Sequence, residues 1–520
     1  MNKLRVGVIL PDANAPAWVR RMLERIQDSS YAEVAALACT GAGGIEGGLA
    51  GSLYRLHFQL DKRAFRPDPD PWERKDIRNL LQNVQPLEGG INEWDTAFKA
   101  SHLDVLLNLS LDHLPESLHD VPRYGVWSLR CNDWRVTVGT DFGWHELLHD
   151  EPLIHCVVEA QRAAHAQAIA RSVAATDPRS FTHNQKTFLW RVAVILPRAL
   201  RQLYLLGEKE FFARAERIDP AGHLPKPRAG QILALAWKQV IRKLRKRFSP
   251  RESRDRWILM AGIHSGGNAF SWNALKPIVP PRGAYWADPF IIQRESKTYL
   301  FFEEFLYKTG LGRIACVEIG NDGNISKPGI ILEKPYHLSY PFVFEYGGEM
   351  YMIPETAQNR TIEIYHCARF PDQWEHHKTI MQDLRAADST LIEHDGLWWL
   401  FVNIAGEGGS TWDELHLFYA DEPLSDHWTP HPLNPIVSDV RSARPAGRIF
   451  GRDDGLVRPS QDSSIRYGYA LNLNRITKLT ANEYEEELME RLEPPDHGAI
   501  LAVHTCNFSG DLAVLDAMLK

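Results

Sequence analysis

The residues of this 520-residue chain whose types and spacing best suit catalysis are three carboxylic acids in its second half. Asp288 and Asp388 each open an apolar segment, and Glu355 closes another, YMIPET. Cleavage of a glycosidic bond needs two carboxyl groups in opposite protonation states, one acid for the leaving oxygen and one base or nucleophile across the sugar. The Met-Ile-Pro run before Glu355 is apolar enough to raise the pKa of its carboxyl group by desolvation, so we expect Glu355 to be the general acid.

Other interpretations of these residues stay open on the sequence. Glu303 and Glu304, at the end of YLFFEE, are alternative candidates for the general acid and also for substrate binding. An aspartate before a proline at the entrance of a strand, such as Asp288, can also simply accept hydrogen bonds from a turn. The catalytic interpretation therefore requires Asp288, Glu355 and Asp388 to converge in space.

The segments that carry these residues repeat along the chain. Asp288, Tyr340 and Asp388 lie 52 and 48 residues apart, and each is followed by an apolar strand pattern, a short polar turn and a second, aromatic-rich strand pattern. A degenerate fourth copy covers residues 443–462. This period suits the four-stranded blades of a β-propeller and is too long for most helical solenoids. A propeller directs the first residues of its innermost strands towards one axis, so we expect Asp288 and Asp388 to face one another.

Polar residues of the fourth copy predict a ligand that carries anionic or hydroxyl groups. Arginine forks match carboxylate and phosphate oxygens. The candidate substrate-binding side chains of this segment are Arg444, Arg458, Gln461 and Asp462. The alternative is that these arginines form salt bridges with nearby acids.

Aromatic side chains near the candidate acids offer flat surfaces for sugar rings. Trp286 precedes Asp288 by two positions, and Tyr340 opens the second copy of the repeat. We expect Trp286 and Tyr340 to contact the substrate. The alternative is that these rings fill the interfaces between blades, where aromatic strands contribute large buried surfaces.

Composition and charge exclude several classes of protein. The chain is 44% hydrophobic and 24% charged, as in ordinary globular proteins, and its length predicts at least two domains. A net charge of -7 argues against a nucleic-acid partner. Six scattered cysteines without a CxxC motif fit a reduced compartment and predict no metal site. The short apolar run at the N-terminus lacks the features of a signal peptide, so we expect a cytoplasmic location.

The first half alternates strand and helix patterns. Residues 4–10 and 33–40 have strand patterns, and a helical pattern at 16–27 lies between them, which predicts a βαβ opening with a parallel sheet. The glycine-rich stretch 40–48 follows the second strand without an obvious helix behind it, so we interpret it as a loop and not as a phosphate-binding motif. Further strands are predicted at 104–110 and 125–129.

The second half contains, in order, WADPFII, YLFFEE, SYPFVFE, YMIPET, DSTLIEHDGLWWLF and YGYALNLNRITKLT. With these segments, residues 255–520 resemble the five-bladed propellers of the arabinanase, xylosidase and invertase-like glycosidases. They resemble more closely the propeller that precedes the transferase domain of plant glucosamine inositolphosphorylceramide transferases. The resemblance implies a five-bladed β-propeller in which Asp288 is the general base and Asp388 tunes the acid and contacts the substrate. We expect the final strand patterns, AILAVHT and DLAVLDAM, to close the ring with RWILMAGIH.

Residues 125–161 follow an order of strand, loop, glycine, helix and strand. This order resembles the formyltransferases that use a tetrahydrofolate donor, and it implies a Rossmann-type α/β domain over residues 1–215. The positions of the family's Asn, His and Asp correspond to Ser128, Arg130 and His165. Arg130 can polarise an oxyanion but, always protonated, cannot act as a base. A tetrahydrofolate derivative would be the cofactor only if this domain is active.

The two halves are joined by residues 216–254, which we expect to form a basic helical linker. The segment IRKLRKRF and its apolar flank also suit a helix that lies on a membrane surface, so residues 230–254 are a candidate for weak membrane contact. The alternative is a helix that packs its apolar stripe on one domain and exposes its cations to water.

The sequence favours a carbohydrate-active enzyme that cleaves or transfers a glycosyl unit at the propeller axis. Its expected substrate is a carbohydrate or glycolipid, met during polysaccharide or glycolipid biosynthesis. Two alternatives stay open. One is a sugar N-formyltransferase or acyltransferase whose propeller binds the substrate, and the other is a non-catalytic glycan-binding scaffold.

Overall fold

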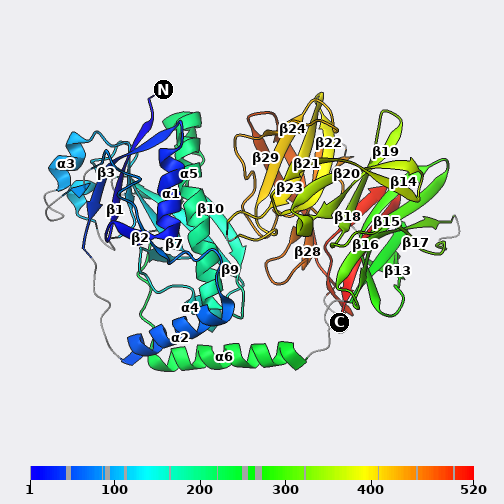
Figure 1. Cartoon of the computed structure of the whole chain (residues 1–520), viewed down its shortest axis with the longest axis horizontal. Helices are drawn as coiled ribbons and strands as arrows, with labels where there is room; N and C mark the ends of the chain where they lie inside the picture. The colour runs from blue at the N-terminus through cyan, green and yellow to red at the C-terminus, as the bar shows by residue number, and fades with distance from the viewer. Residues whose placement is uncertain are drawn as a thin grey trace. The chain divides into compact units, whose positions relative to one another are not determined.

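The chain divides into two compact units, residues 1–247 together with 407–409, and residues 248–406 together with 410–520 (Figure 1). Residues 42–48 of the glycine-rich stretch 40–48 lie outside the described residues. The computed structural model describes residues 2–41, 49–84, 86–87, 94–110, 114–162, 165–219, 221–248, 256–263, 272–320, 324–407, 409–452, 455–495 and 498–520.

The first unit is built on one mixed sheet with the strand order β11-β10-β9-β7-β6-β1-β3-β5, and β8 pairs with β7. β1 (Leu4–Leu10) pairs in parallel with β3 (Ala32–Cys39) and β6 (Val105–Asn108), and β6 pairs in parallel with β7 (Val126–Cys131). The predicted parallel opening is therefore confirmed. The formyltransferase-like identity of residues 1–215 is not shown by this topology and stays a prediction. The other strands of the unit are β2 (Asn14–Pro16), β4 (Arg74–Asp76), β5 (Pro86–Leu87), β8 (Trp134–Val136), β9 (Leu153–Arg162), β10 (His165–Ala175) and β11 (Glu216–Ile218).

Helices cover both faces of this sheet because its central strands are apolar on both sides. Val8 of β1 belongs to the core formed with α1 (Ala17–Gln27) and α5 (Phe181–Ala213). The next residue, Ile9, points to the opposite face and packs with α3 (Trp94–Ala100).

A smaller core joins α2 (Leu49–Phe65), α4 (Trp144–His149) and α6 (Ala229–Phe248) to the first unit. Its buried members include Tyr54, Trp144, Ile232 and Leu235. The segment 216–254, predicted as a linker, therefore contains a helix that packs on the first unit, as the alternative interpretation expected. Within the described residues, no helix is both long and apolar enough to cross a membrane.

The second unit is a five-bladed β-propeller, as predicted. Blade 1 consists of β14 (Ala284–Arg294), β15 (Lys297–Leu306), β16 (Leu311–Ile319) and β17 (Gly329–Leu332). Blade 2 consists of β18 (Ser339–Tyr346), β19 (Glu349–Thr356), β20 (Thr361–Arg369) and β21 (Gln373–Gln382). Blade 3 consists of β22 (Ala386–His394), β23 (Leu397–Ile404), β24 (Leu415–Ala420) and β25 (Thr429–Pro430). Blade 4 consists of β26 (Phe450–Arg452), β27 (Gly455–Asp462), β28 (Ala470–Leu479) and β29 (Tyr484–Leu492). Blade 5 consists of β12 (Arg256–Ile263), β13 (Leu275–Ile278), β30 (Ile500–Ala502), β31 (Cys506–Ser509) and β32 (Leu512–Leu519).

The repeated hairpins at the start of blades 1 to 3 share one turn geometry. The two turn residues of each, at 295–296, 347–348 and 395–396, all have positive φ, between 51° and 83°. Two successive residues of positive φ form the type I′ turn, whose twist matches that of the flanking strands. The hairpin repeat predicted from the sequence is therefore confirmed.

Blade 5 closes the ring with strands from both ends of the unit. β12 pairs with β32 from Arg256 opposite Leu519 to Ile263 opposite Leu512, and β31 pairs with the other edge of β32. This arrangement confirms the predicted closure. It leaves no unpaired edge between the first and last strands, which stabilises the ring.

Candidate functional site

The first strands of blades 1 to 3 carry a shared distortion at the residues that open the repeat. Asp288, Tyr340 and Asp388 have φ values of 53°, 46° and 55°. At each of them the pairing with the second strand of the blade shifts register. Such bulges re-aim side chains, and backbone strain of this kind costs on the order of 1–3 kcal/mol per residue, so it persists where the surrounding structure holds it.

The second strands contribute an equivalent set of polar residues. Glu303, Glu355 and Asn403 each follow the opener of their blade by 15 residues, from 288 to 303, 340 to 355 and 388 to 403. Each pairs with the residue just before that opener. In blades 1 to 3 the repeat therefore places one polar residue of the second strand beside the opener of the first strand.

Four of these positions, together with residues from the rest of the ring, form what we call the axial cluster. Its members are Asp288, Glu303, Glu355, Asp388, Arg444, His504 and Asp516. The three predicted catalytic acids are thus brought together, although they come from three blades.

Arg444 joins two of the predicted catalytic acids. Its Nε and Nη2 atoms donate to the two oxygens of Asp388 at 2.5 and 3.2 Å, and Nη2 also lies 3.2 Å from Oε2 of Glu355. Gln461 donates to the same Asp388 carboxylate at 3.1 Å. Burial lowers the pKa of Arg444, but Asp388 and Glu355 raise it more, so the guanidinium stays charged. The predicted substrate-binding residues Arg444 and Gln461 therefore lie at the cluster.

A second group within the cluster is centred on His504. Its Nε2 lies 3.3 Å from Oδ1 of Asp288, and its Nδ1 lies 2.8 Å from Oδ1 of Asp516. Burial lowers the pKa of His504, but the carboxylates of Asp516 and Asp288 more than offset this, so its net pKa is raised.

Hydrogen bonds hold Asp288 from two other blades. Thr505 donates to its Oδ1 at 2.7 Å, and the backbone N–H of Tyr340 donates to its Oδ2 at 3.1 Å. Burial nevertheless raises the pKa of Asp288 to about 6, while the charge of His504 opposes this and that of Asp388 adds to it.

Two glutamates in the cluster favour their protonated forms. Burial raises the pKa of Glu303 well above its usual range, and the carboxylates of Asp288 and Glu355 raise it further. Burial also raises the pKa of Glu355 well above its usual range, although Arg444 opposes this. The apolar surroundings inferred from the sequence of Glu355 thus have the predicted effect. The Glu355 side chain is 12% exposed and that of Glu303 is 5% exposed.

Burial is the main cause of these pKa shifts, and the excess of carboxyl groups in the axial cluster adds to them. Five carboxyl groups, those of Asp288, Glu303, Glu355, Asp388 and Asp516, face two basic side chains. Carboxylates that share a buried site cannot all ionise, so some of them retain protons near neutral pH. The cluster therefore offers both protonated and ionised carboxyl groups, as general acid and base chemistry requires.

Period-two alternation separates the other predicted residues from the axial cluster. Glu304 pairs with Arg313 at 2.7 Å and accepts a hydrogen bond from Trp286, whose ring packs on Phe302 inside blade 1. The contacts of Trp286 thus lie within blade 1 and not at the axial cluster, so its predicted stacking on a sugar is corrected to a role in packing.

Arg458 and Asp462 lie on the opposite face of β27 from Gln461. Arg458 pairs with Glu486 at 2.6 Å, and Asp462 pairs with Arg491. Both follow the alternative interpretation, that of salt bridges within the blade, and their predicted contact with substrate is corrected.

Tyr340 braces the ring. It is fully buried, its hydroxyl contacts Thr390 at 2.8 Å, and the same hydroxyl accepts from the backbone N–H of Gly447 at 2.8 Å. Its ring meets that of Phe290 edge to face. The predicted contact of Tyr340 with a sugar face is therefore corrected, because this side chain links blades 1 to 4.

Sequence reasoning missed His504, Thr505 and Asp516. Asp516 lies opposite Thr505 in blade 5, as Glu355 lies opposite the start of the first strand in blade 2. The segments AILAVHT and DLAVLDAM that carry them have strand patterns, but they do not keep the 15-residue spacing of blades 1 to 3, so no repeat signal marked these three residues. Asp288, His504 and Asp516 also offer ligand atoms within 4.8 Å of one another, close enough for a metal ion, although a protonated His504 would compete with it.

The predicted residues of the first unit do not form a comparable cluster. Ser128 and Arg130 are buried on β7, and Arg130 contacts Glu159 and the carbonyl of Asp219. His165 begins β10, on the far side of β9, and is exposed, with Arg217 donating to its Nδ1 at 3.1 Å. The catalytic role of these three residues stays a prediction.

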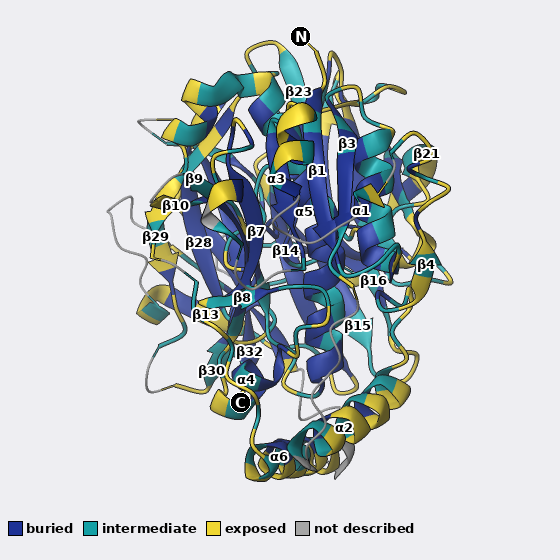
Figure 2. Ribbon diagram, turned by 90° about the vertical axis from the view of Figure 1, so that its left-hand side faces the viewer, coloured by how far each residue is buried: buried dark blue, intermediate teal, exposed yellow. Residues whose placement is uncertain are grey.

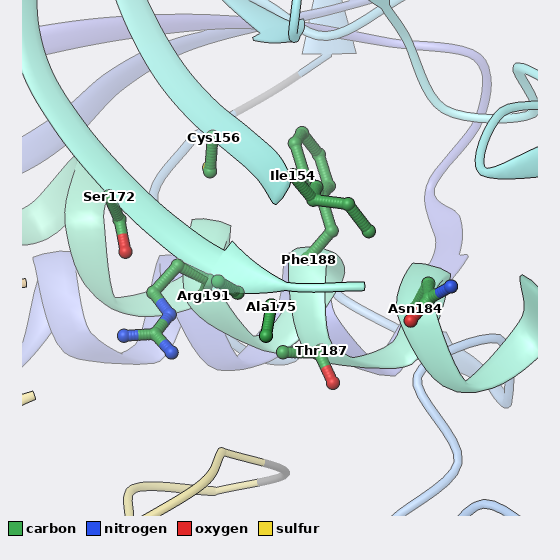
Figure 3. A pocket seen from close by; sticks show the side chains of 9 residues that line it. Ile154, Cys156, Ser172, Ala175, Asn184, Thr187, Phe188 and Arg191 are labelled. Atoms are coloured by element: carbon green, nitrogen blue, oxygen red, sulfur yellow. The ribbon is translucent and has the colours of Figure 1, made fainter. Parts of the chain in front are cut away.

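A small pocket of the first unit lies between β9, β10 and α5 (Figure 3). Ile154, Phe188 and the alanines at 174 and 175 make most of its wall apolar, and Ser172, Asn184, Thr187 and Arg191 contribute polar groups. None of the residues predicted for formyl transfer lines it.

Comparisons with known proteins place the propeller among carbohydrate-related sequences. A family model described as glucosamine inositolphosphorylceramide transferase 1, N-terminal, matches residues 278–498. Glucosamine inositolphosphorylceramide transferase 1 of Oryza sativa subsp. japonica is 37% identical over 234 residues, which are 43% of this chain and 31% of that protein. The Arabidopsis thaliana protein of the same name is 36% identical over 206 residues, 39% of this chain and 27% of that protein. The chain thus spans about a third of the length of these relatives.

Solved structures with similar folds include glycoside hydrolases. A thermostable family-43 glycoside hydrolase is 14% identical, with a TM-score of 0.32, and the match covers 41% of this chain and 77% of that chain. A family 117 glycoside hydrolase from Zobellia galactanivorans is 14% identical, with a TM-score of 0.35, and the match covers 52% and 92%.

Proposed function

We propose that the propeller acts on a glycosidic bond, by hydrolysis or by glycosyl transfer, with the axial cluster as its active site. The observation that carries this proposal is the convergence of Asp288, Glu355 and Asp388 around Arg444 and His504, where burial raises the pKa of Glu355 well above its usual range and that of Asp288 to about 6. A pair of carboxyl groups in opposite protonation states is what glycosyl chemistry requires.

Glu355 is the proposed general acid. Its pKa is raised well above its usual range by burial, so it retains a proton near neutral pH. Glu303 has a similarly raised pKa, but Glu355 is the more exposed of the two and can reach a substrate with less rearrangement. An acid that works near neutrality needs this combination of a raised pKa and access to the leaving oxygen.

Asp288 is the proposed base. Thr505 and the backbone of Tyr340 fix its carboxylate, and its pKa of about 6 lets it ionise near neutral pH. Asp388, whose two carboxylate oxygens accept hydrogen bonds from Nε and Nη2 of Arg444, is the proposed contact for sugar hydroxyl groups. Arg444 also neutralises charge next to Glu355, which limits how far the pKa of that acid rises.

The relatives support a substrate that contains a sugar and a lipid. Their name is that of a glucosamine inositolphosphorylceramide transferase, and the matched segment lies in the propeller. We therefore propose a glycolipid or polysaccharide substrate in a biosynthetic reaction. A cytoplasmic location stays part of the proposal.

One observation favours a second function, non-catalytic glycan binding. Both oxygens of Asp288 already have partners, Thr505 and His504 at one and Tyr340 at the other. A base with these contacts would have to give one up to accept a proton from water or an acceptor hydroxyl. In a glycan-binding scaffold the same contacts would serve only to hold blades 1, 2 and 5 together.

The test is a panel of furanosides, pyranosides and nucleotide-linked sugars, incubated with the full-length chain with and without formyl-tetrahydrofolate. The Asp288→Asn variant is compared with wild type, and Glu349→Gln, an exposed carboxylate on β19, is the matched control. Turnover that survives in the control and is lost in Asp288→Asn supports the proposal. Glycan binding without turnover in any protein would establish the scaffold instead, and turnover that requires formyl-tetrahydrofolate would contradict both.

A further inference from the structure

Helix α6 exposes a stripe of large apolar side chains. Leu233, Trp237, Val240 and Leu244 are 60%, 66%, 47% and 48% exposed. Their spacing of four, three and four residues places them on one face of the helix. Exposed apolar residues are unremarkable when they are scattered, but an ordered stripe of four marks an interaction surface.

This stripe is separate from the face that packs on the first unit. The buried face of α6 carries Ile232, Leu235 and Gln239, and His57 of α2 contacts Gln239 at 2.7 Å. At about 100° per residue, the centres of the two faces lie roughly 140° apart around the helix. Packing within the first unit therefore accounts for one apolar face of α6 and not for the other.

The charges of α6 are all positive. The helix contains no Asp or Glu, and Lys238, Lys243 and Arg245 lie on the flanks between its two apolar faces. Lys238 pairs with Asp150 at 2.7 Å, whereas Lys243 and Arg245 are exposed. Lys243 also lies 5.0 Å from the centre of the Phe65 ring of α2, where its long side chain extends beside the neighbouring helix. An apolar stripe with cations on both sides is complementary to an apolar layer beneath a negatively charged surface.

The neighbouring helix α2 continues this pattern. Leu56 and Leu60, one turn apart, are 58% and 55% exposed, and the cations Arg55 and Arg63 are exposed beside them. Figure 2 shows α2 and α6 side by side at one end of the first unit, with broad exposed surfaces.

We propose that this surface, defined by Leu233, Trp237, Val240 and Leu244 of α6 with Leu56 and Leu60 of α2, docks on an anionic phospholipid membrane. The apolar stripe enters the boundary between head groups and acyl chains, where the amphipathic ring of Trp237 is favoured. The flanking lysines and arginines remain at the level of the lipid phosphates, each contributing about 1 kcal/mol of attraction. Docking of this kind holds the protein at a lipid surface whatever reaction the propeller performs.

The experiment is flotation of the full-length chain with vesicles of phosphatidylcholine alone and vesicles that also contain phosphatidylglycerol. We expect binding to the mixed vesicles only, and weaker binding as salt is added. The combined variant Leu233→Ser, Trp237→Ser and Leu244→Ser should bind the mixed vesicles at least about tenfold more weakly than wild type. Reversal of charge at Lys243→Glu and Arg245→Glu should weaken binding by at least about tenfold.

The matched control is Val279→Ser with Leu488→Ser, two exposed apolar residues of the propeller, which are 67% and 59% exposed. This control should bind as wild type does. Equal binding of wild type and the triple serine variant, or the absence of binding to anionic vesicles, would overturn the proposal. A dimer in sedimentation velocity that the triple variant abolishes would also overturn it, in favour of a second copy as the occupant. Neither readout involves a sugar, so the result is independent of the proposed reaction.

Discussion

Removal of the positive charge of Arg444 tests the electrostatic account of the axial cluster. Arg444 is 7% exposed and makes contacts with Asp388 at 2.5 Å and Glu355 at 3.2 Å. Loss of one partner from a buried ion pair leaves an uncompensated charge and costs about 3–5 kcal/mol. We therefore expect Arg444→Met to destabilise the propeller by about 3–5 kcal/mol near pH 7.

The pH dependence of this loss has a definite sign. Arg444 lowers the pKa of Glu355, so its removal raises an already raised pKa further. The folded variant then binds a proton that the unfolded chain releases, and its stability falls as pH rises through that interval. The deficit relative to wild type should thus be larger at pH 8 than at pH 5, because a protonated Glu355 needs no cation.

The assay is hydrogen exchange of propeller peptides in the full-length chain, at increasing urea and at both pH values. Arg458→Met is the control, because it removes another buried ion pair, with Glu486 at 2.6 Å, within blade 4. Arg458→Met should also destabilise the propeller but leave sugar binding unchanged. Arg444→Met should lower both the stability of the propeller and its sugar binding. If Arg444→Met were as stable as wild type at pH 8, or if its loss of stability did not change with pH, the reasoning would be refuted.

Two further predictions concern ring closure and the histidine of the axial cluster. A Cβ atom on Gly447, at φ 132°, would lie 2.0 Å from the carbonyl oxygen of Cys506. Gly447→Ala should therefore lower the melting temperature of the full-length chain sharply. The control Gly451→Ala should not, because the space around Gly451 is open. Equal melting of the two variants would contradict this packing. Asp288→Asn removes a carboxylate that raises the pKa of His504, so NMR titration of the imidazole should show a lower pKa than in wild type; an unchanged titration would mean that the two side chains do not interact.

The architecture of the propeller could be predicted because its determinants are local. A two-residue turn such as Asp395-Gly396 fixes the hairpin in which it lies, and the same pattern recurs at a blade's length. Ring closure followed from strand patterns at both ends of the unit. The parallel opening of the first unit followed from the continuous apolar character of residues 4–10.

The membership of the site was predictable only in part, since it depends on which face of a strand each residue occupies. Gln461 and Arg458 belong to one segment, yet alternation sends only Gln461 to Asp388. The bulge at Asp288 alters that alternation, so the side on which Glu303 and Glu304 would fall could not be counted from the sequence.

Blade 5 was the hardest part to anticipate. Its two inner strands come from the end of the chain, and only 11 residues separate Thr505 from Asp516, against 15 between Asp288 and Glu303. His504 therefore carried no repeat signal, although its contact with Asp288 makes it part of the site.

The role of Glu355 as general acid is the central claim, and the dependence of turnover on the leaving group tests it most directly. The measurement compares kcat/KM of wild type and Glu355→Gln on glycosides of the reactive sugar with an alkyl and with a nitrophenyl leaving group. A nitrophenolate departs without protonation, so loss of the acid should cost about 100-fold or more with the alkyl glycoside and far less with the nitrophenyl glycoside. Equal losses on both substrates, or unchanged turnover of the alkyl glycoside, would contradict the account.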